Sequence, residues 1–108
     1  MKLFMNKNEK YEEPGVHMFF HKQTKEVEQV EKFVRSLSIT IPAKYEDEIY
    51  KLYPTDIYYI ETIDRRTYLY TASRVYESSE NLLSLEKLLE AAGFIRVRKN
   101  CIINKYKL

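Results

Sequence analysis

Three short β-prone segments follow one another in the middle of the chain, and they limit the fold more than any other feature. Residues 57–61, 67–71 and 74–77 are rich in tyrosine, isoleucine and threonine, which favour strands. The connections between them are short and polar, whereas parallel pairing needs a crossover of a dozen or more residues. The spacing therefore predicts a three-stranded antiparallel meander.

Further strands are predicted before the meander. Residues 15–22 alternate between two faces with a period of two, which is typical of a strand. Residues 38–42 read as a second strand that ends at Pro42, because proline has no N–H to donate to a ladder. Residues 47–52 form a third β segment that leads into a turn at 53–56.

Two amphipathic helices are predicted by apolar residues that recur every three or four positions. The first spans residues 24–37 with Thr24 as its N-cap. Its apolar positions are Val27, Val30, Phe33, Val34 and Leu37. The second begins at residues 78–81, and Gly93 follows it where a left-handed C-terminal cap is expected. Its apolar positions are Leu82, Leu85, Leu88, Leu89 and Ala92.

The last segments return to β structure. Residues 94–97 read as a strand, 98–100 as a polar loop, and 101–104 as a short strand or half-turn. Residues 105–108 look like the start of one more strand. The fold class that follows is mainly β with two helices, an α+β protein with antiparallel sheets.

Composition places the chain among small globular proteins. Its 108 residues suffice for one core, and 44% are hydrophobic while 31% are charged. No apolar run approaches the roughly 18 residues of a membrane span, so we expect no membrane insertion. Cys101 is the single cysteine, which excludes an internal disulfide and fits a reducing cytoplasm, the expected location.

Several kinds of chemistry are disfavoured. With two glycines, the chain has no glycine-rich phosphate loop. His17 and His21 lie about 13 Å apart if they occupy a strand, too far to share a metal ion. Cys101 between apolar neighbours reads as a buried, unreactive thiol. We expect no catalytic site, no metal and no cofactor, and therefore not an enzyme.

The basic residues and the tyrosines each allow two interpretations, one with a nucleic-acid or other anionic partner and one without. Acidic residues stop at Glu90, and five cations follow: Arg96, Arg98, Lys99, Lys105 and Lys107. Such a block suits an anionic partner, but equally a solvated tail. Four tyrosines lie inside the predicted strands, where core packing is favoured over a stacking surface for nucleic acid. They are Tyr58, Tyr59, Tyr68 and Tyr70.

A set of motifs runs from residue 56 to residue 104. It opens with Asp-Ile-Tyr-Tyr-Ile-Glu at 56–61, followed by a basic loop, a return strand and a helix with Leu82, Leu85, Glu86 and Leu89. Phe94, Arg96, Val97, Arg98 and Ile102-Ile103-Asn104 complete it. In this order the motifs resemble the LytTR DNA-binding domain of bacterial regulators and its signature F-x-R-V-H-R-S-x-x-V-N. Arg98 replaces the signature histidine and Asn100 its serine, and both remain polar donors.

The resemblance implies an elongated set of small antiparallel sheets whose inter-strand loops enter the major groove of double-stranded DNA. It assigns DNA contacts to two loops: Arg65, Arg66 and Thr67, and Arg98, Lys99 and Asn100. Lys99 falls at the position most associated with base contact. Arginine suits guanine or phosphate, and lysine and asparagine suit base edges or phosphate. The implied protein is a response regulator-like transcription regulator that binds repeated half-sites as a homodimer.

Three further residues carry predictions. Arg96 and Lys105 are candidates for phosphate contact, and Arg96 could equally form an internal ion pair with Glu61. Asn104 is expected to hold backbone groups at the start of the last strand instead of touching DNA.

The resemblance also suggests how the chain is divided. Residues 1–45 are similar to the strand-helix leader of stand-alone family members, and residues 46–108 to the DNA-binding domain. The family pattern continues with further strands, so we expect a C-terminally shortened domain with an exposed edge strand. An alternative function follows: a protein–protein interaction module, or edge-mediated self-association, through that strand.

Overall fold

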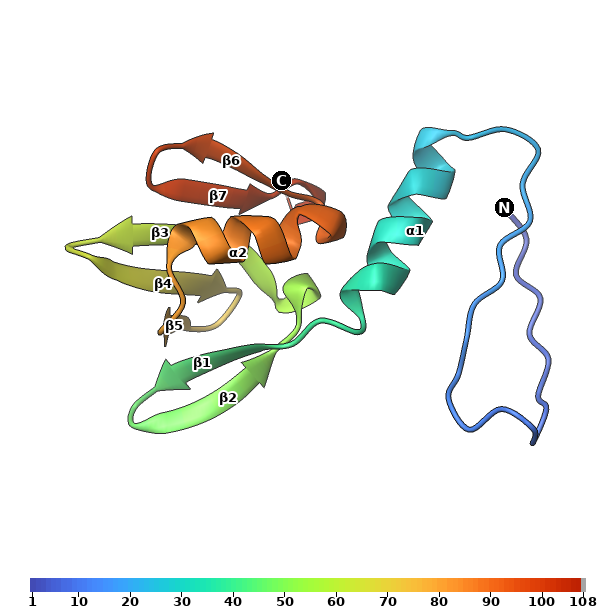
Figure 1. Ribbon diagram of the computed structural model, residues 1–108, viewed down its shortest axis with the longest axis horizontal. Helices are drawn as coiled ribbons and strands as arrows, with labels where there is room; N and C mark the ends of the chain where they lie inside the picture. Colours follow the sequence, from blue (N-terminus) through green and yellow to red (C-terminus); the bar gives the residue numbers. More distant parts are fainter. Residues whose placement is uncertain (108) are drawn as a thin grey trace.

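Seven strands form one antiparallel sheet in the computed structural model, which describes residues 1–107 (Figure 1). The strands are β1 (Ile41–Tyr45), β2 (Glu48–Leu52), β3 (Ile57–Ile63), β4 (Arg66–Thr71), β5 (Val75–Ser78), β6 (Phe94–Arg98) and β7 (Cys101–Asn104). Their order across the sheet is β2-β1-β5-β4-β3-β7-β6. The helices are α1 (Lys25–Ser36) and α2 (Leu82–Leu89), with 3-10 turns η1 (Pro54–Asp56), η2 (Glu90–Ala92) and η3 (Lys105–Lys107).

The predicted fold class, mainly β with two helices, is confirmed. The resemblance implied several small sheets, whereas the strands of the described residues join into a single one. The hairpin of β1 and β2 is paired with the other strands of the sheet at one residue pair, Lys44 of β1 with Glu77 of β5.

The predicted meander is confirmed as β3, β4 and β5, all antiparallel. The connection between β3 and β4 is shorter than the expected stretch 62–66, because Ile63 pairs with Arg66 and only two residues turn the chain. Asp64 and Arg65 both have positive φ, 50° and 66°. Two left-handed residues in a two-residue hairpin match the twist of the flanking strands.

Pro42 lies within a strand, so the prediction that it ends one is wrong. The strand spans Ile41–Tyr45, shifted from the expected 38–42. β1 pairs with β5 only at Lys44, which leaves the Pro42 end of β1 with a free side. A missing N–H costs little there, since proline is tolerated where a strand lacks a neighbour.

The N-terminal segment forms no strand, so the prediction for residues 15–22 is also wrong. Residues 1–24 run on the far side of α1 from the sheet (Figure 1), and Val16 and Phe19 are 67% and 83% exposed. A strand needs a partner strand to receive its backbone hydrogen bonds, and among the described residues the segment 15–22 pairs with no strand. The predicted cap of the first helix is confirmed: Thr24 Oγ1 accepts from Val27 N at 3.3 Å.

Helix α2 covers one face of the sheet and contacts β3, β6 and β7. Asn81 is its N-cap and accepts from Ser84 N at 2.8 Å. Leu85 and Leu89 are fully buried, but Leu88, expected on the apolar stripe, is 45% exposed. The core that α2 closes contains Ile41, Ala43, Leu52, Ile57, Ile60, Leu69, Tyr76, Leu82, Leu85, Leu89, Ala92, Phe94 and Ile102.

The chain turns back after β7 and does not start another strand, so the prediction for residues 105–107 is wrong; Leu108 lies outside the described residues. Lys105 N donates to Gly93 O at 3.2 Å, and Tyr106 N donates to Asn104 Oδ1 at 3.0 Å. Gly93 has the predicted left-handed conformation, φ 92°. The Tyr106 ring occupies the space that a Cβ on Gly93 would take, so this contact also requires glycine.

Of the four strand tyrosines, Tyr58 and Tyr59 lie at the surface of the sheet, whereas Tyr68 and Tyr70 are half-buried. Tyr58 and Tyr59 are 40% and 37% exposed, so the core-packing interpretation is wrong for them. The Tyr59 and Tyr70 rings stack with centroids 4.1 Å apart. Burial, and secondarily the Glu61 carboxylate, raise the pKa of Tyr70 above its ordinary value.

Candidate nucleic-acid interface

The two predicted contact loops lie side by side at one end of the sheet. They are the β3–β4 turn at Asp64 and Arg65 and the β6–β7 turn at Lys99 and Asn100, which Figure 1 shows at the same end. They meet there because β3 and β7 are antiparallel neighbours. Thr62 N donates to Asn100 O at 2.9 Å, which joins the two hairpins directly.

A shallow groove of about 410 Å³ separates these turns from the start of α2. Its lining residues are Thr62, Arg65, Thr67, Ser78, Ser79, Glu80, Asn81, Leu82, Arg96, Lys99 and Asn100. The first predicted loop contributes Arg65 and Thr67, and the second contributes Lys99 and Asn100. The groove is therefore where the two sets of predicted contact residues come together.

The first predicted loop contains two exposed arginines and one buried threonine. Arg65 is exposed at the tip of the turn. The Arg66 guanidinium is 3.8 Å from the Glu77 carboxylate, with 68% of its side chain exposed. Thr67 is only 5% exposed, and its hydroxyl lies 3.5 Å from that of Thr62. Arg65 and Arg66 can reach a partner, while Thr67 bridges the two strands from within.

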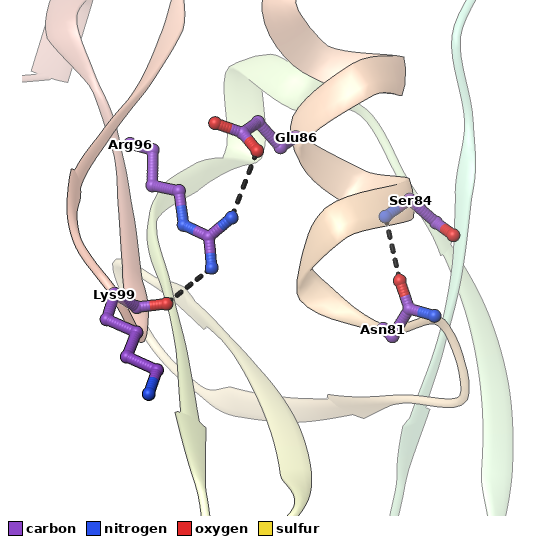
Figure 2. A network of polar contacts seen from close by, with 5 residues as sticks. All are labelled: Asn81, Ser84, Glu86, Arg96 and Lys99. Carbon is purple, nitrogen blue, oxygen red and sulfur yellow. Dashed lines mark hydrogen bonds and ion pairs between the residues drawn. The ribbon is translucent and has the colours of Figure 1, made fainter.

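The second predicted loop is open to solvent. Arg98, Lys99 and Asn100 are all exposed. Asn100 Nδ2 lies 3.5 Å from Thr62 O, a long hydrogen bond beside the backbone bond described above. Within residues 1–107 the Lys99 ammonium has no hydrogen-bond or ion-pair partner, and Figure 2 shows its side chain directed away from the Arg96 guanidinium. The Lys99 charge is free to meet an anion.

Arg96 forms an internal ion pair, but the prediction that its partner is Glu61 is wrong. Its Nη1 lies 3.1 Å from Glu86 Oε1 on α2, and its Nη2 donates to Lys99 O (Figure 2). The Arg96 side chain is 32% exposed and that of Glu86 35%. The sequence could not show whether Glu61 or Glu86 pairs with Arg96, because the packing of α2 beside β6 decides the pairing.

The other two predicted residues lie at the opposite end of β7. Lys105 follows that strand, with its Nζ 5.4 Å from the centre of the Tyr106 ring. Asn104 is 4% exposed, and its Nδ2 donates to Ile57 O at 3.0 Å and to Pro54 O at 3.4 Å. The prediction that Asn104 holds backbone groups is confirmed, but these groups lie in η1 and at the start of β3, and not in a further strand after β7.

Sequence reasoning missed the contribution of the β5–α2 connection. Ser79, Glu80 and Asn81 line the groove beside Arg65 and Lys99. The cluster of serine and asparagine marked the start of a helix, but its position next to the two turns depends on the order of the sheet. No pattern in the sequence showed that order.

Metal-ligating side chains, the thiol and the helices can be located within residues 1–107. No three His, Cys, Asp or Glu side chains lie together where they could hold a metal ion. Cys101 is 3% exposed, as expected for a buried thiol. No helix there is long and apolar enough to cross a membrane.

Comparisons with known proteins agree with this geometry. The chain is 31% identical over 104 residues to the sensory transduction protein LytT of Enterococcus faecalis (strain ATCC 700802 / V583). That alignment covers 91% of this chain but only 42% of the relative's length. A solved LytTr DNA-binding domain from Bacillus cereus has the same fold, with a TM-score of 0.58, 24% identity and 62% of each chain covered.

The family itself is shown by a match over more than half of the chain. Residues 47–108 match the family described as the LytTr DNA-binding domain. This stretch contains strands β2 to β7, helix α2 and both exposed turns. The chain therefore belongs to the LytTr DNA-binding domain family.

Proposed function

We propose that this chain binds double-stranded DNA as a bacterial transcription regulator in the cytoplasm. The β3–β4 and β6–β7 turns enter the major groove. The observation that carries the proposal is the meeting of these turns at one end of the sheet. Together they present four exposed cations: Arg65, Arg66, Arg98 and Lys99. Exposed loops on a rigid sheet are well suited to this task, because the strands fix where the side chains project.

Within this surface the residues have different roles. Lys99 contacts a base edge, since its ammonium has no partner among residues 1–107 and lies at the tip of its turn. Arg65, Arg66 and Arg98 contact phosphate or guanine, which arginine can bind through two parallel hydrogen bonds. Asn100 contributes to the same surface, and the buried Thr67 supports the first turn from behind. A phosphate contact by Lys105 requires DNA to extend about 13 Å along β7.

Sequence specificity comes from pairing two copies. One chain offers one pair of turns, which covers a short half-site. A homodimer on repeated half-sites doubles the number of base contacts. Residues 46–108 supply the DNA surface, while residues 1–45 form a leader that also provides α1 and β1.

Lys99→Ala and Lys105→Ala test this assignment. Lys99→Ala reduces preference for the best sequence, because a base contact is worth about 1–3 kcal/mol on that sequence and little on others. Lys105→Ala removes the same charge at the other end of β7, and weakens binding to all sequences alike. Affinities for a preferred and an unrelated duplex, at one salt concentration, measure both effects. Equal behaviour of the two variants contradicts the role of Lys99.

A second candidate function is a protein–protein interaction module, favoured by the free edge of the sheet. β6 is the outermost strand on its side and pairs only with β7 among the described residues. Ile95 and Val97 on this strand are 47% and 49% exposed. An uncovered strand with exposed apolar side chains can accept a strand from another chain.

A further inference from the structure

The backbone of the β6–β7 turn is held from two sides, and one of these contacts comes from a charged side chain. On the β3 side, Thr62 N donates to Asn100 O at 2.9 Å. On the α2 side, the Arg96 guanidinium donates to Lys99 O through Nη2 and pairs with Glu86 through Nη1 (Figure 2). The Lys99 side chain is left unpaired between these two supports.

The guanidinium is the group suited to this position. It presents donors in a rigid planar fork, so one side chain can bind a carboxylate and a carbonyl at once. Lysine would bring the same charge as a compact ammonium on a flexible stem. The Glu86 and Arg96 side chains are about one-third exposed, so their pair is less screened than one at the open surface.

Arg96 is poorly placed to contact DNA directly. Both of its terminal nitrogens already have partners, Glu86 Oε1 and Lys99 O. A phosphate bound to Arg96 would also approach the Glu86 carboxylate, 3.1 Å from Nη1, and be repelled by it.

We propose that Arg96, fixed by Glu86, is the positioning residue for sequence recognition by Lys99. Its two contacts hold the turn against α2, so that Lys99 meets a base edge in one defined orientation. This inference rests on the proposed DNA-binding function. It assigns Glu86 a part in DNA recognition although an acidic side chain repels DNA.

Glu86→Gln provides the sharpest test. Loosening the Arg96 support reduces the ratio of affinities for a preferred and an unrelated duplex about fivefold, the lower end of what one base contact contributes. If Arg96 contacted phosphate, Glu86→Gln would instead strengthen binding to both duplexes by the same factor and leave their ratio unchanged, because it only removes a negative charge near the DNA. Glu31→Gln is the matched control: it makes the same charge change at an exposed ion pair on α1, with Arg35 at 2.9 Å. It leaves the ratio unchanged.

Arg96→Lys separates the geometry of this side chain from its charge. A phosphate contact would largely survive this substitution, whereas the fork that joins Glu86 to Lys99 O is lost. The ratio of affinities therefore falls in Arg96→Lys as it does in Glu86→Gln. The double variant is no worse than Arg96→Lys alone, because both changes act on one support. Full retention of the ratio in Arg96→Lys, or additive losses, overturns the proposal.

A measurement on the free protein keeps this inference distinct from the proposed function. Hydrogen exchange at the backbone amides of residues 98–100 becomes faster in Glu86→Gln and Arg96→Lys, and remains unchanged in Glu31→Gln. Exchange in the central strands β3 and β4 stays as in the parent protein, which shows that the variants are folded. If exchange in the turn does not change, Arg96 does not hold the turn. The positioning proposal is then wrong, whether or not the protein binds DNA. If exchange changes as expected but no duplex is bound, the proposed function fails and the recognition role fails with it.

Discussion

At the end of β7, the Asn104 side chain forms hydrogen bonds with backbone groups, in place of the bonds that a further strand pairing would supply. Its amide donates to the carbonyls of Ile57 and Pro54, which lie 47 and 50 residues earlier, and accepts from Tyr106 N. One buried side chain thus joins the start of β3 to the end of β7 and turns the chain into η3. Asn104 is only 4% exposed, so water has little access to replace these hydrogen bonds, and their loss would lower the stability of the fold.

Asn104→Ala lowers the free energy of unfolding by about 2–3 kcal/mol, because it leaves the Ile57 carbonyl and the Tyr106 N–H without their partner. Chemical denaturation of the variant and the parent protein measures the difference. Asn6→Ala, at an exposed position in the N-terminal segment, is the control and changes stability by less than about 0.5 kcal/mol. A loss below that value for Asn104→Ala would mean that the Asn104 contacts contribute no net stability.

At the scale of elements, β6 serves two purposes. Its inner side pairs with β7, and Arg96 on this strand contacts α2. Its outer side is unpaired among the described residues, next to the exposed Ile95 and Val97. The sequence interpretation placed the open edge at residues 105–108. The structure assigns it to β6 because η3 folds back onto Gly93.

We predict that the chain self-associates through β6 at high micromolar concentration. Sedimentation across a concentration series detects this, and Ile95→Lys shifts the protein towards monomer because an edge lysine opposes strand pairing. Ile49→Lys introduces the same charge on β2, at the other edge of the sheet, and leaves the association unchanged. A parent protein that stays monomeric, or equal effects of the two variants, rules out the β6 edge as the interface.

Across the whole molecule, the sequence predicted local features well and long-range contacts poorly. The meander, both helices, the Thr24 cap and the left-handed Gly93 follow from short-range patterns, and all are present. The alternating segment 15–22 has the pattern of a strand but pairs with no other strand among the described residues. A period of two shows only that a segment could form a strand; another strand must be available to complete it.

The candidate site shows the same limit. The resemblance identified both turns, but it did not show the burial of Thr67 between β3 and β5. It also did not show the pairing of Arg96 with Glu86, which depends on how α2 packs on the sheet. Residues 79–81 line the groove only because β5 ends beside the two turns. Such relations between distant parts of the chain are set by sheet order, for which a single sequence holds no direct signal.

Affinity for duplex DNA at two salt concentrations tests whether the exposed turns bind it. The DNA would be a set of duplex fragments that includes the promoter region next to the gene. If Arg65, Arg66 and Arg98 of the turns and Lys105 each contact one phosphate, a plot of log affinity against log salt concentration has a slope of about −3.6. The affinity then falls about 150-fold between 50 and 200 mM salt. We expect this steep loss together with tighter binding to one fragment. An affinity that does not change with salt, or no duplex binding at the lower salt concentration, would contradict this expectation.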